Sequence, residues 1–366
     1  MKLRMAVALA GCLSTAVAAQ TPAPSGVLLV LAKTDLTLST VDPATFKVLG
    51  RVPSGPDPHE VVASPDGRVA YVSNYGGGSF NTITVVDLVE QKALPPIDLG
   101  PLRGPHGLMF AAGKLWFTAE GAKVIGSYDP GTKQIDLVLG TGQNRTHMIF
   151  VSDDTSRIVT SNVSSATMTI IEKTAARRGF GPGGPPAGAP GRGGNPGPPG
   201  GAPNRGGGRG PGGPLQTDWD ETVVPVGRGV EGFDVSPDGK EIWAANAQDG
   251  TISIVDVATR KVTQTLAANV NGANRLKFTP DGKLVFISTL GGSDLTIIDA
   301  ATRRETKRVK IGRGAAGIQM QPDGSRAYVA CTPDDYVAVI DLKSLEVTGR
   351  IDAGKQPDGL AWAVRR

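Results

Sequence analysis

Residues 230–266 hold one complete repeat of the chain: Val-Glu-Gly-Phe-Asp-Val-Ser-Pro-Asp-Gly (230–239), Glu-Ile-Trp-Ala-Ala-Asn (241–246), Thr-Ile-Ser-Ile-Val-Asp (251–256) and Lys-Val-Thr-Gln-Thr-Leu (261–266). Short runs in which apolar and polar residues alternate, separated by Pro, Asp, Asn and Gly, predict strands joined by tight turns. Four short strands in one repeat are typical of a β-propeller blade.

An acidic residue ends the third run of every repeat. These residues are Asp42, Asp87, Asp129, Glu172, Asp256, Asp299 and Asp341. Successive acids lie 45, 42, 43, 84, 43 and 42 residues apart, and a period of this size indicates stacked repeats. Most of them precede Ser or Thr by three residues, a spacing that predicts a hydrogen-bonding role in turns rather than catalysis.

The repeats predict an all-β fold, a seven-bladed β-propeller of four-stranded blades, over residues 26–366. We expect the first blade to be split, with residues 27–52 supplying its outer three strands and residues 357–364 returning from the C-terminus as its inner strand. Pairing of the two ends in one blade closes the ring and protects the strand edges.

The interval of 84 residues contains an insertion and not an eighth blade. Residues 177–214 are almost wholly Gly, Pro, Ala, Asn and Arg, without an acidic residue and with Phe180 as the one large apolar side chain. Such a segment has too little apolar surface to offset its ordering entropy. We therefore predict a disordered Gly/Pro/Arg-rich insertion at 174–217, within blade four.

The first residues have the pattern of a targeting segment. Two basic residues, a short apolar stretch and small residues near Ala18 predict a signal peptide at 1–19, and hence a periplasmic or secreted protein. A lipoprotein anchored at Cys12 is the alternative. No later stretch is long and apolar enough to span a bilayer. We also expect the protein to be a monomer. Loss of the leader would leave Cys331 alone, which excludes an intrachain disulfide and favours a packing role for that thiol.

All three histidines of the chain occupy one register of the repeat. The second residue of the seven inner strands is, in blade order, Asp358, His59, His106, His147, Glu231, Asn274 and Ala316. Four blades have a different residue at this position, so blade folding does not require histidine. Because inner strands line the channel of a propeller, we expect these side chains at its mouth, where a preformed pocket can bind a ligand.

The residue types at the mouth leave three interpretations open. His59, His106, His147 and Glu231 could hold a divalent metal, with Zn, Fe or Cu suited to such nitrogen and oxygen ligands. The same residues could instead bind a polar ligand without metal, or could simply hydrogen-bond to channel water.

Basic residues recur beside this register. They are Arg103, Arg228, Arg313 and Lys355, three positions before it, together with Arg145 and Arg275. A cationic rim would favour an anionic small molecule or an acidic partner protein. Lys and Arg total 38 against 34 Asp and Glu, and no aromatic ladder accompanies the arginines, so nucleic acid is disfavoured.

Residues 230–256 resemble the YVTN family of β-propeller repeats, whose signature combines Pro-x-Gly, Ser-Pro-Asp-Gly-Lys, Tyr-Val-x-Asn and Val-x-Val-Ile-Asp. The resemblance covers residues 26–366 apart from the insertion. It implies a binding or scaffold protein, a lactonase or a domain of a redox enzyme.

Two shorter stretches point to enzymes. Residues 57–68 look like a lactonase-family blade, and residues 113–120 look like a streptogramin-lyase blade. No nucleophile elbow, phosphate loop or haem motif is present. We therefore expect an exported YVTN-type binding or scaffold protein that uses a polar, cation-rimmed channel mouth. The alternative is a metal-dependent lactonase or lyase in which a histidine acts as general base.

Overall fold

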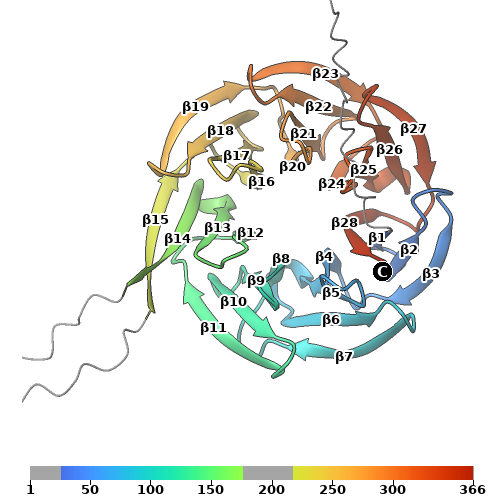
Figure 1. Ribbon diagram of the computed structural model, residues 1–366, viewed down its shortest axis with the longest axis horizontal. Coiled ribbons are helices and arrows are strands. Elements are labelled where there is room, and N and C mark those ends of the chain that lie inside the picture. Colours follow the sequence, from blue (N-terminus) through green and yellow to red (C-terminus); the bar gives the residue numbers. More distant parts are fainter. Residues whose placement is uncertain (1–25, 176–216, 366) are drawn as a thin grey trace, which may run out of the picture.

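Seven four-stranded antiparallel sheets form a ring around a central axis (Figure 1). The computed structural model describes residues 26–175 and 217–365. All seven inner strands line a central cavity of about 510 Å³. The predicted seven-bladed propeller is confirmed.

The strands of each blade are given from the inner to the outer edge. Blade one contains β28 (Pro357–Val364), β1 (Gly26–Ala32), β2 (Thr37–Val41) and β3 (Val48–Pro53); blade two β4 (Pro58–Ala63), β5 (Val69–Asn74), β6 (Thr82–Asp87) and β7 (Lys92–Asp98); blade three β8 (Pro105–Ala111), β9 (Lys114–Ala119), β10 (Val124–Asp129) and β11 (Gln134–Gly140); blade four β12 (Thr146–Val151), β13 (Arg157–Asn162), β14 (Thr167–Ala175) and β15 (Thr217–Pro225). Blade five contains β16 (Val230–Val235), β17 (Glu241–Asn246), β18 (Thr251–Asp256) and β19 (Lys261–Ala267); blade six β20 (Ala273–Phe278), β21 (Leu284–Thr289), β22 (Asp294–Asp299) and β23 (Arg304–Lys310); blade seven β24 (Ala315–Met320), β25 (Arg326–Cys331), β26 (Tyr336–Asp341) and β27 (Glu346–Ile351). Three short 3₁₀ turns follow second strands, at η1 (Gly76–Gly78), η2 (Val163–Ser165) and η3 (Thr332–Asp334).

The split first blade is confirmed. β28 pairs antiparallel with β1 from Gly26↔Val364 to Ala32↔Pro357, so the two ends of the propeller lie in one sheet (Figure 1). The other inner strands begin where the repeat predicts, from Pro58 in blade two to Ala315 in blade seven.

The recurring acids are turn residues. Thr45 Oγ1 donates a hydrogen bond of 2.7 Å to Asp42 Oδ2, and Thr259 makes the equivalent bond of 2.7 Å to Asp256. Glu172, which lacks this Ser or Thr partner, instead forms ion pairs with Arg157 and Arg260. The predicted turn role is confirmed for the Asp-x-x-Thr turns.

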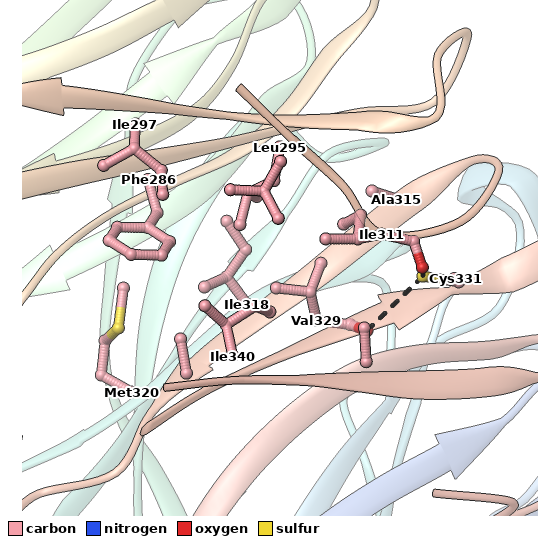
Figure 2. Close-up of a cluster of buried hydrophobic side chains, with 13 residues drawn as sticks. Phe286, Leu295, Ile297, Ile311, Ala315, Ile318, Met320, Val329, Cys331 and Ile340 are labelled. Atoms are coloured by element: carbon pink, nitrogen blue, oxygen red, sulfur yellow. Dashed lines mark hydrogen bonds between the residues drawn. The ribbon is translucent and has the colours of Figure 1, made fainter. Parts of the chain in front are cut away.

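The core consists of apolar clusters between neighbouring blades. Figure 2 shows the cluster between blades six and seven, in which Phe286 and Leu295 of one blade pack against Ile318 and Val329 of the next. Each fully buried side chain of this size contributes roughly 1.5–3 kcal/mol. Cys331 packs in the same cluster, and burial raises the pKa of its thiol to about 11, which suits a packing role.

The predicted signal peptide, 1–19, lies outside the described residues, as does nearly all of the predicted insertion, 174–217. β14 and β15 pair up to Ala175↔Thr217, so residues 176–216 lie in the sequence between the third and fourth strands of blade four. Within the two described ranges, no helix has the length and hydropathy needed to cross a membrane.

Candidate functional site

In some blades, a glycine directly follows the inner-strand position that holds the histidines, and it lets neighbouring inner strands approach closely. A Cβ on Gly107 would lie 2.6 Å from the carbonyl oxygen of His147, and one on Gly359 would lie 2.4 Å from that of His59. A side chain at either position would force the two strands apart. The two glycines therefore let His106 approach His147, and Asp358 approach His59.

The three imidazoles lie in a row across blades two, three and four. The ring centroids of His59 and His106 are 5.1 Å apart, and those of His106 and His147 are 3.8 Å apart. His106 and His147 are only 3% and 2% exposed. Burial, together with the His147 and His59 rings, holds the pKa of His106 well below its ordinary value, and His106 Nδ1 has no hydrogen-bond partner among the described residues.

His147 lies between two carboxylates. Its Nδ1 is in close contact with Glu120 Oε1, and its Nε2 lies 2.9 Å from Glu231 Oε2. The second contact is an ion-pair distance without hydrogen-bond geometry, so Nε2 has no hydrogen-bond partner in the described chain. Burial alone would lower the pKa of His147, but the hydrogen bond to Glu120 and the negative charges of Glu120 and Glu231 raise it above its ordinary value.

Two further side chains hold these carboxylates. Tyr75 donates its hydroxyl hydrogen to Glu120 Oε2 at 2.6 Å. Arg145 lies 3.2 Å from Glu231 Oε1 and 3.6 Å from Glu120 Oε2. Burial acts to raise the pKa of Glu231, but His147 and Arg145 lower it, so this carboxylate is stabilised in its charged form.

The atoms that could hold a metal ion come from His106, Glu120 and His147. One nitrogen or oxygen of each lies within 4.8 Å of the others, and all three residues are buried. Glu231 adjoins them through its contact with His147. We call these four residues the His/Glu group.

His59, expected as a fourth ligand, belongs to a different cluster. Lys33 Nζ lies 2.7 Å from His59 Nε2 and 3.4 Å from Asp358 Oδ2, and Asp57 Oδ1 lies 3.3 Å from His59 Nε2. Burial is the largest of the effects that lower the pKa of His59. We call Lys33, Asp57, His59 and Asp358 the lysine cluster; it adjoins the His/Glu group through the His59 and His106 rings.

An ion pair joins the inner strands of blades six and two across the central cavity. Arg275, on β20 of blade six, is in close contact with Glu60, on β4 of blade two, and both side chains are largely buried. Arg275 also donates to Asn274 Oδ1 at 3.2 Å. Among the basic residues predicted at the mouth, Arg145 and Arg275 therefore lie inside the site.

The other basic residues lie in loops outside it. Arg228 and Arg313 are each paired with an aspartate, Asp249 and Asp334, at 2.7 Å, and both arginine side chains are 72% exposed. Arg103 donates to the carbonyl oxygen of Ser79. The backbone N–H of Lys355 donates to Asp35 Oδ2. The two ion pairs reduce the positive potential that Arg228 and Arg313 could supply.

Carboxylates outnumber cationic groups in the site even when His147 is protonated. The acids are Asp57, Glu60, Glu120, Glu231 and Asp358, and the bases are Lys33, Arg145, His147 and Arg275. An excess of negative charge in a partly buried pocket favours a cation as its first occupant.

Tyr75, Glu120 and Lys33 were missed by the sequence analysis, although they share a second register. Each follows directly after the second strand of its blade. The equivalent residues in blades four to seven are Val163, Ala247, Leu290 and Thr332. Alignment of the blades on the end of the second strand would have shown three charged or phenolic residues in consecutive blades.

Comparison with known proteins identifies the fold alone. No family model matches the chain, and no curated protein matches its sequence, so the YVTN resemblance stays a prediction. Similar solved structures include a functionally unknown protein from Desulfotomaculum acetoxidans (14% identity, TM-score 0.67, covering 93% of this chain and 100% of that one). Kuenenia stuttgartiensis hydrazine synthase is also similar (18% identity, TM-score 0.63, covering 91% of this chain and 99% of that one). So is a candidate 6-phosphogluconolactonase from Bacteroides fragilis (14% identity, TM-score 0.65, covering 94% of this chain and 99% of that one).

Proposed function

We propose that the His/Glu group binds a divalent metal ion and that the protein acts on the carbonyl of a small molecule, as a metal-dependent lactonase or lyase. The observation that carries this proposal is the meeting of His106, Glu120 and His147 within 4.8 Å in a buried site. The unpartnered Nδ1 of buried His106 supports it, since an orphaned buried nitrogen is costly unless a ligand satisfies it.

The donor set fits the metals expected from the sequence. Imidazole nitrogens and carboxylate oxygens suit Zn²⁺, Fe²⁺ and Cu²⁺, and three protein ligands would leave a coordination position open for substrate. A bound ion would polarise a carbonyl oxygen of the substrate as a Lewis acid.

The protein's own residues would orient the ligands and move a proton. Tyr75 fixes the Glu120 carboxylate, as outer partners of metal ligands generally do. Lys33 Nζ lies 2.7 Å from His59 Nε2 and its charge favours the neutral imidazole, so His59 could act as a general base toward the substrate or water. The signal peptide predicted at 1–19 supports a periplasmic or secreted location for this activity.

Metal-free binding of an anionic ligand is the second candidate. The specific observation in its favour is the raised pKa of His147, because a protonated imidazole cannot ligate a metal and attracts an anion. Metal content separates the two candidates.

Zinc titration of chelator-treated protein, prepared without a histidine tag, tests the proposal. We expect stoichiometric binding in the wild type and an affinity lower by at least about tenfold in His106→Ala. Asn81→Ala is the matched control, because Asn81 bonds Asp98 and Gly100 outside the His/Glu group. Absence of zinc binding, or equal binding by His106→Ala, would contradict the proposal.

A further inference from the structure

The backbone position two residues before the histidine register is left-handed in every blade. In four blades it is glycine: Gly104, Gly229, Gly272 and Gly314. In the other three it is Asp57, Arg145 and Gln356, at φ of 42°, 58° and 53°. Glycine adopts this conformation without strain, whereas a side chain there costs stability. A strained non-glycine residue points to a role for its side chain.

Arg145 occupies this position beside the His/Glu group. Its guanidinium lies 3.2 Å from Glu231 Oε1 and 3.6 Å from Glu120 Oε2, and its side chain is 38% exposed. Glu120, the carboxylate that would ligate a metal, is therefore already near a cation that reaches solvent. Any entering metal must compete with Arg145 for it.

We propose that Arg145 is a displaceable counter-ion: a metal bound by His106, Glu120 and His147 takes Glu120 from Arg145, and the guanidinium then binds an oxyanion of the substrate. This inference rests on the proposed metal site, and it names the second ligand as a molecule that carries a carboxylate or a phosphate. Guanidinium groups bind such anions in a bidentate manner.

The charges of the site support this order of events. Without metal, the Arg145 guanidinium lies between the two carboxylates, Glu120 and Glu231. A divalent ion bound to Glu120 would remove one of the two carboxylates that surround Arg145, which leaves the guanidinium with less compensating negative charge. An anion then binds more favourably, so metal and anion must each increase the affinity for the other.

Calorimetric zinc titrations of chelator-treated protein, with and without sulfate at matched ionic strength, test the inference. For the wild type we expect sulfate to lower the zinc Kd by at least about fivefold. Arg145→Gly introduces the residue found in four sister blades, so it should fold. This variant should bind zinc at least about fivefold more tightly than the wild type does without sulfate, and sulfate should have no effect on it.

Gln356→Gly is the matched control, since it relieves the same left-handed conformation while its backbone N–H bonds Asp335, outside the His/Glu group. It should keep the wild-type zinc affinity and sulfate dependence.

Equal zinc affinity and equal sulfate dependence in Arg145→Gly and the wild type would overturn the inference and leave the metal site standing. Failure of both proteins to bind zinc would overturn the metal site and the inference together. Zinc binding by Arg145→Gly alone would support Arg145 as the competing cation.

Discussion

Glu120→Gln should destabilise the metal-free protein at acidic pH more than at alkaline pH. Glu120 is buried and contacts His147, Tyr75 and Arg145. The substitution keeps the size of the side chain and an oxygen that accepts from Tyr75, but it removes the charge. His147 then loses the hydrogen bond that contributes most to raising its pKa.

The sign follows from the raised pKa of His147. A group whose pKa is higher in the folded state stabilises the protein fully below its unfolded pKa, about 6.5, and this contribution is lost as pH rises through the folded pKa. Glu120→Gln diminishes this contribution, so the difference in the free energy of unfolding between variant and wild type is largest near pH 6 and small near pH 9.

The expected magnitude is roughly 1–2 kcal/mol near pH 6, because a charge-assisted hydrogen bond contributes about 1.5–3 kcal/mol and a neutral one about 0.5–1.5 kcal/mol. The larger cost of breaking a buried ion pair, about 3–5 kcal/mol, does not apply, since Glu231 remains beside His147 and the imidazole can lose its proton.

Urea unfolding of chelator-treated protein, followed by tryptophan fluorescence, measures the two free energies. Asp249→Asn, which breaks the exposed Arg228–Asp249 pair, is the control and should leave the free energy of unfolding nearly unchanged at both pH values. A loss in Glu120→Gln that is equal at both pH values, or larger near pH 9, would refute the assignment of His147 as a stabilising imidazolium.

Three further predictions concern the construction of the ring. Gly107→Ala should weaken zinc binding, because the added Cβ would lie 2.6 Å from the carbonyl oxygen of His147; an unchanged zinc affinity would show that the close approach of the strands is not needed. Deletion of residues 356–366 should cause aggregation, measured by light scattering, because it removes β28 and exposes an edge of β1; a stable monomer would contradict ring closure as the source of solubility. Replacement of residues 177–214 by a short Gly-Ser linker should leave the thermal midpoint nearly unchanged, and loss of soluble protein would show that the segment is structural.

The fold could be predicted because the same pattern of strands and turns recurs in successive repeats of the sequence. Strand alternation, Pro-Asp-Gly turns and the acid that ends each third strand recur at a fixed interval, so errors in one blade are corrected by the others. The returning strand β28 was predictable for the same reason, since Asp358-Gly359 matches the start of the other inner strands.

The site could be predicted only in part. Register alone brought His106, His147 and Glu231 to one place, but it could not assign the partners of each imidazole. His59 faces Lys33, which comes from the first blade, and Arg228 pairs with an aspartate of its own blade. Such pairings depend on side-chain rotamers and loop geometry, which the repeat does not specify.

A crystal structure of zinc-soaked protein, with anomalous data recorded on both sides of the zinc edge, tests the central claim most directly. We predict an anomalous peak bonded to His106, Glu120 and His147, at roughly 2.0–2.2 Å from each nitrogen or oxygen ligand. We also predict that Arg145 will have moved away from Glu120. A fully occupied zinc peak elsewhere, with His147 still held between Glu120 and Glu231, would contradict the metal site.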